Sequence, residues 1–141
     1  MNVGFIGLGI MGRAMSARLM DGGHQLCVHS HKPAPKELTD KGARDCRFPR
    51  EVASASEVII TMVPDTSDVE DVLFGQDGVA AGLSPGKIFV DMSSISPIAT
   101  KDFAQRIQQL GCEYLDAPVS GGDVGARQGT LTIMVGGSEK A

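Results

Sequence analysis

The chain has 141 residues, of which 42% are hydrophobic and 21% charged, and its formal net charge is −4. This composition is typical of one soluble globular domain with a sizeable core. The acidic balance, without a Lys/Arg cluster, argues against nucleic-acid or anionic-membrane partners. No apolar run is long enough to span a membrane and no signal peptide is recognised, so we expect a cytoplasmic protein.

Apolar runs of strand length alternate with stretches of helical spacing along the whole chain. The expected strands are residues 2–6, 25–29, 43–46, 57–63, 87–91, 112–116 and 131–135. The expected helices are 10–20, 35–41, 49–55, 66–74 and 97–110, whereas residues 121–129 are expected to form a loop. This alternation predicts a single α/β domain over residues 1–141, with a Rossmann-type, doubly wound and mainly parallel sheet.

The first strand leads directly into a glycine-rich turn, Gly7-Leu8-Gly9-Ile10-Met11-Gly12, and then into a helix. A lone G-x-G-x-x-G is a weak signal, but this strand–loop–helix context is that of a dinucleotide-binding fold. There, Gly7 makes the tight turn, Gly9 lets the backbone approach a pyrophosphate, and Gly12 lets the helix pack closely on the strand. The helix N-terminus offers free N–H groups to the phosphates.

Three later strands end in turns rich in small, hydroxyl-bearing or proline residues, at 62–65, 91–97 and 116–122. Ligands of open α/β sheets bind outside the carboxyl ends of the strands, so we expect these turns to line a cleft with the glycine loop. Each turn alone is more often a helix cap. Asp91 and Asp116 could suggest a carboxylate pair, but turn hydrogen bonding is the commoner role of such residues.

Blocks of sequence resemble the β-hydroxyacid dehydrogenase family, which includes 3-hydroxyisobutyrate, tartronate semialdehyde and 6-phosphogluconate enzymes. They are GFIGLGIMG at 4–12, MVPD at 62–65, DMSSISP at 91–97, DAPVSGG at 116–122 and GTLTIMVGG at 129–137. The resemblance covers essentially the whole chain. The combination of the sequences VPDT and DMSSISP is most similar to the tartronate semialdehyde (2-hydroxy-3-oxopropionate) reductase branch. It implies an NAD(P)-dependent oxidoreductase that reduces this small-molecule substrate to glycerate. A 3-hydroxyisobutyrate dehydrogenase type is the alternative within the family.

The resemblance also assigns site residues. It implies cofactor contacts from Gly7, Leu8, Gly9, Ile10, Met11, Gly12, Ser30, His31, Lys32, Met62, Val63, Pro64 and Ser94. It implies that Ser120, Gly121 and Gly122 bind the substrate, with Ser120 as a catalytic positioning group. Backbone N–H groups at a glycine turn, together with a hydroxyl, suit a small carboxylate.

The family's general acid is a lysine in a K-x-x-x-N pattern of a second, helical domain, and no lysine of this chain lies in such a pattern. The resemblance therefore implies that the chain stops before the helical catalytic and dimerisation domain. Reduction of a carbonyl needs a proton for the forming alkoxide, so we expect little catalysis from these residues alone. The full-length protein is expected to be a homo-oligomer. A non-catalytic dinucleotide-binding module is the alternative from a different functional class.

The end of the second strand bears on the choice between NAD and NADP. An acidic residue there would hold the ribose 2′-OH of NAD, but the stretch at 28–32 reads VHSHK and contains none. Many relatives have Asn-Arg-Thr where this chain has Ser30, His31 and Lys32, and His31 is a weaker phosphate ligand than arginine. Binding of NADP or NAD is expected, with NADP slightly favoured.

Two other patterns concern metals and thiols. Cys27, His29 and His31 alternate along the second strand and could form part of a Zn or Cu site, but no fourth ligand is evident, so no metal is expected. The cysteines Cys27, Cys46 and Cys112 are odd in number and lack a C-x-x-C motif, which indicates reduced and mostly buried thiols.

Overall fold

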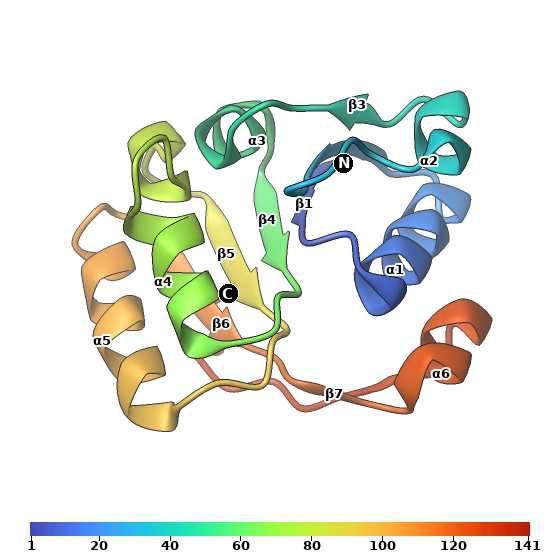
Figure 1. Ribbon diagram of the computed structural model, residues 1–141. Helices are drawn as coiled ribbons and strands as arrows, with labels where there is room; N and C mark the ends of the chain where they lie inside the picture. Colours follow the sequence, from blue (N-terminus) through green and yellow to red (C-terminus); the bar gives the residue numbers. More distant parts are fainter.

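The computed structural model describes residues 1–141 and contains a parallel sheet of six short strands (Figure 1). The strands are β1 (Asn2–Ile6), β2 (Gln25–His29), β3 (Arg44–Asp45), β4 (Val58–Thr61), β5 (Ile88–Asp91) and β6 (Glu113–Asp116). They lie in the order β3-β2-β1-β4-β5-β6, so the chain adds strands on one side of β1 and then on the other. This order is that of a Rossmann-type, doubly wound sheet, and the predicted fold class is confirmed.

Helices cover the sheet on both faces. They are α1 (Ile10–Asp21), α2 (Lys36–Asp40), α3 (Pro49–Ala55), α4 (Thr66–Phe74), α5 (Pro97–Gln108) and α6 (Gly122–Gln128), with a 3-10 turn at Val79–Gly82. Buried side chains of α3, α4 and α5 form one apolar cluster with the sheet, and those of α1, α2 and α6 belong to a second cluster on the other face. Figure 1 shows α3, α4 and α5 on one side and α1 and α6 on the other.

Local signals explain why several helices begin where the sequence predicted. Asp65 and Asp68 form a reciprocal capping box at the start of α4, each side chain accepting a backbone N–H at the other residue. Ser96 caps α5 by accepting from Ala99 N–H, and Pro97 supplies the first helical position. These contacts satisfy backbone donors that the first helical turn would otherwise leave without partners.

The prediction of a loop at 121–129 is wrong, because Gly122–Gln128 forms α6. Small residues allow this helix to pack closely: Gly125 and Ala126 are buried, and a Cβ on Gly125 would lie 3.2 Å from Leu131 Cδ2. The helix ends at Gly129, in the left-handed conformation (φ 71°) that favours glycine. Tertiary packing therefore outweighs the low intrinsic helix propensity of a glycine-rich stretch.

The expected strand at 131–135 is shorter and does not join the parallel sheet. β8 (Thr132–Ile133) instead pairs antiparallel with β7 (Val119–Ser120), which the sequence did not predict, to form a separate two-stranded ribbon. The connection between the two strands contains α6, and it reverses the chain so that β8 runs back along β7.

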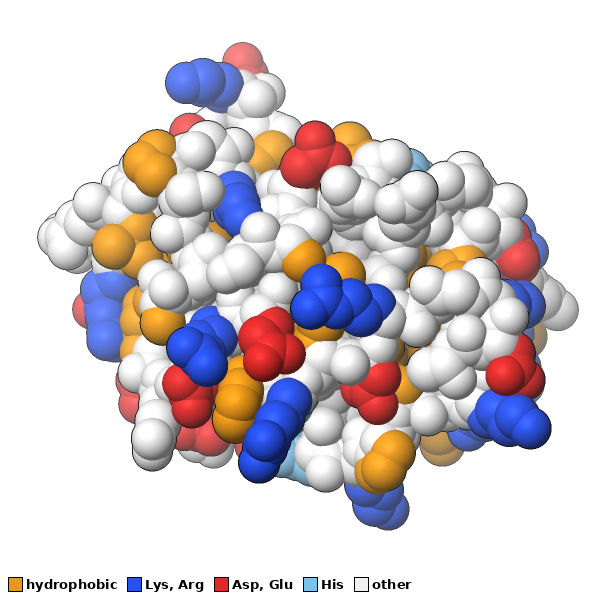
Figure 2. All heavy atoms as spheres, turned by 90° about the horizontal axis from the view of Figure 1, so that it is seen from above, with side chains coloured by type: hydrophobic (Ala, Val, Ile, Leu, Met, Phe, Trp, Pro, Cys, Tyr) orange, Lys and Arg blue, Asp and Glu red, His pale blue; other side chains and the backbone are white.

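The surface carries charges of both signs. Figure 2 shows Lys and Arg side chains interspersed with Asp and Glu rather than gathered into one basic patch on the face it displays. No helix of the structure is both long enough and apolar enough to cross a membrane.

Candidate functional site

The glycine loop connects β1 to α1 and its three glycines are constrained differently. Gly7 has a φ of +100°, and a Cβ there would collide with the Met62 carbonyl oxygen. A Cβ on Gly12 would collide with the Gly7 carbonyl oxygen. Gly9 has extended backbone (φ −69°, ψ −167°), and a Cβ there would meet nothing within 4 Å. Gly7 and Gly12 are therefore required by the protein's own packing, whereas the space beside Gly9 is open.

A cavity of about 480 Å³ opens beside this loop, at the carboxyl ends of the strands. All the predicted cofactor-binding residues line it except Lys32 and Ser94, which are exposed and lie outside it. Asp68, Asp71 and Val72 of α4 also line the cavity and were not predicted. The sequence could have indicated them, because they lie in α4, the helix that follows β4. This helix begins at the same edge of the sheet as the glycine loop.

One wall of the cavity is held by a buried carboxylate. Asp91, at the end of β5, has no exposed surface, and its Oδ1 accepts from Thr61 Oγ1 (2.9 Å) and from Ser93 N–H (3.0 Å). The Ser93 hydroxyl oxygen in turn accepts from Val63 N–H (2.9 Å). Asp91 thereby links the ends of β4 and β5 and fixes the Val63 backbone at the cavity wall.

Burial raises the pKa of Asp91 above its ordinary value of 3.8, and its hydrogen bonds from Ser93, Thr61 and Tyr114 offset part of this increase. Tyr114 OH donates to Asp91 Oδ2 at 3.5 Å, and burial together with the nearby negative charge raises the tyrosine pKa. The pKa of Asp116 is raised by burial and then by the charge of Asp91. Asp91 lies behind the cavity wall with its oxygens engaged, so turn hydrogen bonding describes it better than a catalytic carboxylate pair.

The predicted substrate residues lie outside this cavity. Ser120 is exposed in β7, and Gly121 and Gly122 form the turn into α6 with φ values of +131° and +62°. Figure 1 shows β7 leading away from the sheet toward α6, which lies beside α1. The structure therefore places these three residues together, and none of them is among the residues that line the glycine-loop cavity.

The end of β2 reaches the same cavity through Ser30 and His31. His29 Nδ1 lies 3.0 Å from the Cys46 carbonyl oxygen, which fixes the imidazole against β3. Further along, Ala34 N–H donates to Asp45 Oδ2 at 3.0 Å and ties the segment after β2 to the sheet edge. These two hydrogen bonds therefore hold the end of β2 and the segment after it against the edge of the sheet at β3.

The residues of the metal and thiol patterns do not form a metal site or a disulfide. No three His, Cys, Asp or Glu side chains lie in an arrangement that could hold a metal ion. The three cysteines are free; Cys46 and Cys112 are buried, as predicted, and Cys27 is half-buried. Burial and the neighbouring Cys27 raise the pKa of the Cys46 thiol to about 11, which suppresses its reactivity.

Comparison with known proteins places this geometry among related chains. The family described as the NAD binding domain of 6-phosphogluconate dehydrogenase matches residues 2–141. The chain is 55% identical over 139 residues to 2-hydroxy-3-oxopropionate reductase of Escherichia coli, covering 99% of this chain and 48% of that protein. It is 40% identical over 138 residues to human mitochondrial 3-hydroxyisobutyrate dehydrogenase, covering 97% of this chain and 41% of that protein.

Solved structures agree. A Mycobacterium tuberculosis 3-hydroxyisobutyrate dehydrogenase described with L-serine superimposes with a TM-score of 0.89 at 36% identity, over 99% of this chain and 47% of that one. Psf3, described in complex with NADP⁺ and 2-OPP, gives a TM-score of 0.92 at 33% identity, over 98% of this chain and 49% of that one. The chain thus spans about half the length of the relatives it matches.

Proposed function

The chain belongs to the family of NAD-binding domains described for 6-phosphogluconate dehydrogenase, and from this premise we propose that it is the cofactor-binding half of an NAD(P)-dependent reductase. The proposed reaction is the reduction of 2-hydroxy-3-oxopropionate to glycerate. In it, the bound nicotinamide cofactor supplies the hydride, and this chain binds and orients the cofactor and one end of the substrate.

One observation carries the cofactor assignment: the cavity lies where the direction of strand addition reverses. β1 and β4 are neighbours although two other strands separate them in the sequence. The loops after β1 and β4, through Gly9 and Val63 among others, both line the cavity. Such a switch point is where dinucleotides bind in doubly wound sheets, with the pyrophosphate against the N-terminus of the first helix.

The substrate assignment rests on similarity and on the β7–α6 turn. Identity to the E. coli 2-hydroxy-3-oxopropionate reductase (55%) exceeds that to the human 3-hydroxyisobutyrate dehydrogenase (40%). We propose that Ser120, Gly121 and Gly122 hold the substrate carboxylate, because a hydroxyl and glycine N–H groups present donors without bulk. A 3-hydroxyisobutyrate dehydrogenase activity remains the second candidate, supported by the relatives of that name.

The alkoxide formed by hydride transfer needs a proton. No lysine lines the glycine-loop cavity of this chain. We propose that the donor is the lysine of a helical domain, as in the resembling family, and that residues 1–141 alone bind cofactor with little turnover. Association into homo-oligomers is proposed for the protein that has both domains.

The substrate proposal is tested by calorimetric titration of the chain, first saturated with the oxidised cofactor, with glycerate and then with 3-hydroxyisobutyrate. Wild-type protein should bind glycerate more tightly than 3-hydroxyisobutyrate. Ser120→Ala should weaken the binding of glycerate by roughly tenfold, the effect of one hydrogen bond to a charged group. The matched control is Ser67→Ala, which removes an exposed hydroxyl from α4. Equal affinity of wild type and Ser120→Ala for glycerate would contradict the substrate assignment.

A further inference from the structure

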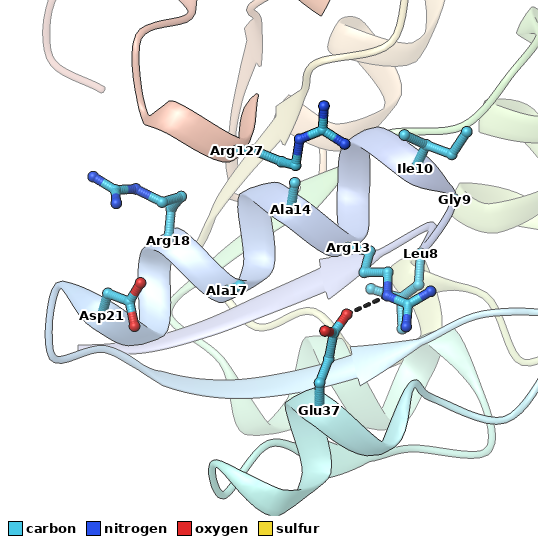
Figure 3. Close-up of a pocket in the computed structure, with 10 residues that line it drawn as sticks. All are labelled: Leu8, Gly9, Ile10, Arg13, Ala14, Ala17, Arg18, Asp21, Glu37 and Arg127. Atoms are coloured by element: carbon cyan, nitrogen blue, oxygen red, sulfur yellow. Dashed lines mark hydrogen bonds and ion pairs between the residues drawn. The ribbon is translucent and has the colours of Figure 1, made fainter. Parts of the chain in front are cut away.

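A second groove, of about 640 Å³, opens at the same glycine loop and shares Leu8, Gly9 and Ile10 with the cofactor cavity. It follows α1 along its exposed side, as Figure 3 shows. Three arginines line it, Arg13 and Arg18 from α1 and Arg127 from α6. The proposed function makes no use of these side chains.

The arginines do not act as one cationic cluster. Arg18 and Arg127 point away from Arg13 in Figure 3, and Arg127 pairs with Asp123 of its own helix at 3.3 Å. Arg13 instead extends past Leu8 toward α2, where its Nε is ion-paired with Glu37 Oε1. Only Arg13 therefore places a guanidinium between the glycine loop and the element that follows β2.

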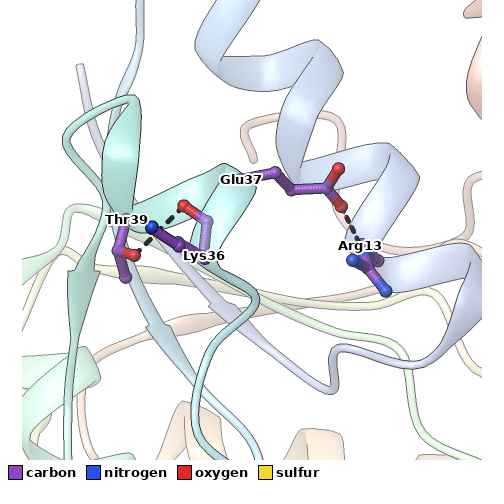
Figure 4. A network of polar contacts seen from close by, with 4 residues as sticks. All are labelled: Arg13, Lys36, Glu37 and Thr39. Atoms are coloured by element: carbon purple, nitrogen blue, oxygen red, sulfur yellow. Dashed lines mark hydrogen bonds and ion pairs between the residues drawn. The ribbon is translucent and has the colours of Figure 1, made fainter.

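Glu37 reaches across from α2 to meet Arg13. Figure 4 shows its side chain directed at α1, whereas Thr39 bonds within its own helix, donating from Oγ1 to the Lys36 carbonyl oxygen at 3.2 Å. The segment between β2 and α2 carries Ser30 and His31 into the cofactor cavity and is anchored through Ala34 to Asp45. The Arg13–Glu37 pair thus joins the first part of α1, which follows the glycine loop, to α2, which follows this segment.

Dinucleotide-binding folds recognise the adenosine ribose near the glycine loop and the end of the second strand: an acid after that strand accepts from a 2′-OH, and an arginine nearby accommodates a 2′-phosphate. The stretch at 28–32 has no acid and carries one cation, Lys32. Glu37 is the first acid after β2, and Arg13 is the arginine that it pairs with beside the glycine loop. Resting on the proposed function, we infer that Arg13 binds the 2′-phosphate of NADP and that Glu37 competes for Arg13, so that this pair sets the cofactor preference.

The exchange of one anion for another is energetically feasible. The side chains of Arg13 and Glu37 are 52% and 54% exposed, so their ion pair is screened by water and contributes little to folding. A phosphate can therefore replace the carboxylate at small cost, and a guanidinium binds phosphate through two parallel N–H donors. Glu37 remains beside the phosphate and repels it, so the carboxylate lowers the preference for NADP.

The test compares two fragments of the cofactor, 2′,5′-ADP and 5′-AMP, by calorimetric titration of the 141-residue chain. Arg13→Gln should weaken the binding of 2′,5′-ADP roughly tenfold to a hundredfold, as expected for loss of a charge-assisted contact to the 2′-phosphate. The Kd for 5′-AMP, which lacks that phosphate, should change less than about twofold. Glu37→Gln should strengthen 2′,5′-ADP. The matched control Arg18→Gln, on the same helix and groove, should change neither. All three residues are exposed, and thermal melts check that each variant folds.

Each other result overturns the inference. Equal weakening of both fragments in Arg13→Gln would show a structural role, and an unchanged ratio would show no contact with the 2′-phosphate. Inorganic phosphate that displaces 2′,5′-ADP at comparable concentration would show unspecific anion binding. These results leave the proposed function intact, since wild type still binds the adenosine fragments. If folded wild-type protein bound neither fragment and neither NADPH nor NADH, the proposed function would fail together with the inference.

Discussion

Replacing Gly9 with alanine separates the cofactor site from the fold that supports it. The backbone of Gly9 is extended, and a Cβ there meets nothing within 4 Å, so the native structure accepts alanine without strain. Alanine restricts the unfolded chain, so the free energy of unfolding should increase by about 0.4–1 kcal/mol. For a chain of this length, this raises the melting temperature by roughly 1–4 °C.

Binding should change in the opposite direction. The open space at Gly9 is where the pyrophosphate would approach the backbone, and a methyl group would hold it away from the N–H donors at the start of α1. Loss of one such hydrogen bond to a charged group costs about 1.5–3 kcal/mol, or roughly a 10- to 150-fold weaker Kd. The assay is calorimetric titration with NADPH, paired with a thermal melt.

The matched control is Gly136→Ala, because the nearest atom to a Cβ there is the Asp116 carbonyl oxygen at 3.8 Å and the residue lies outside the cofactor cavity. It should leave NADPH binding unchanged. Gly9→Ala protein that melts like wild type and binds NADPH with unchanged affinity would refute the placement of the pyrophosphate at this loop.

Substitutions at three further positions examine the framework of the site. Asp91→Ala should lower the free energy of unfolding by about 1–3 kcal/mol, measured by urea denaturation, because Thr61 and Ser93 lose a buried acceptor. Asp91→Asn keeps an acceptor oxygen and should lower it less. Equal losses in the two variants would contradict the hydrogen-bond network around Asp91. Burial raises the pKa of Asp91 in the native state above its ordinary value of 3.8. Between the unfolded-state pKa and the native-state pKa, the native state binds more protons than the unfolded state, so the free energy of unfolding falls as pH rises through that window. Asp91→Asn should remove this part of the slope in melts across acidic pH, and an unchanged slope would show that Asp91 does not titrate as described. Gly12→Val should destabilise by about 2–4 kcal/mol in the same denaturation assay, since its Cβ collides with a backbone carbonyl, and wild-type stability would exclude that close packing. Asp65→Ala should cost about 0.5–2 kcal/mol through loss of the α4 cap, and no change would show that the capping box does not stabilise the helix.

The sequence predicted the elements whose boundaries are set by local physics. β1 and β2 match the expected residues, and α1 begins where expected, because an apolar run, a tight glycine turn and closing glycines act within a few residues of each other. The cap at Ser96 likewise fixes the start of α5. Such signals need no knowledge of the rest of the chain.

Features that depend on distant contacts were missed. The helix α6 exists because Gly125 and Ala126 pack closely, and β8 pairs with β7 instead of extending the sheet. The ion pair between Arg13 and Glu37 joins residues 24 positions apart, so only the folded arrangement of α1 and α2 reveals it. The cleft was predicted from the strand ends, and the turn at 62–65 lines it as expected, through Met62, Val63 and Pro64. The turns at 91–97 and 116–122 were also expected to line it, but none of their residues does so.

The central claim is that residues 1–141 form a dinucleotide-binding site by themselves. Parallel calorimetric titrations of the wild-type chain with NADPH and NADH test it most directly. We predict saturable binding of one cofactor per chain, tighter for NADPH because Arg13, Ser30, His31 and Lys32 favour a 2′-phosphate. A folded chain that binds neither cofactor would contradict the claim.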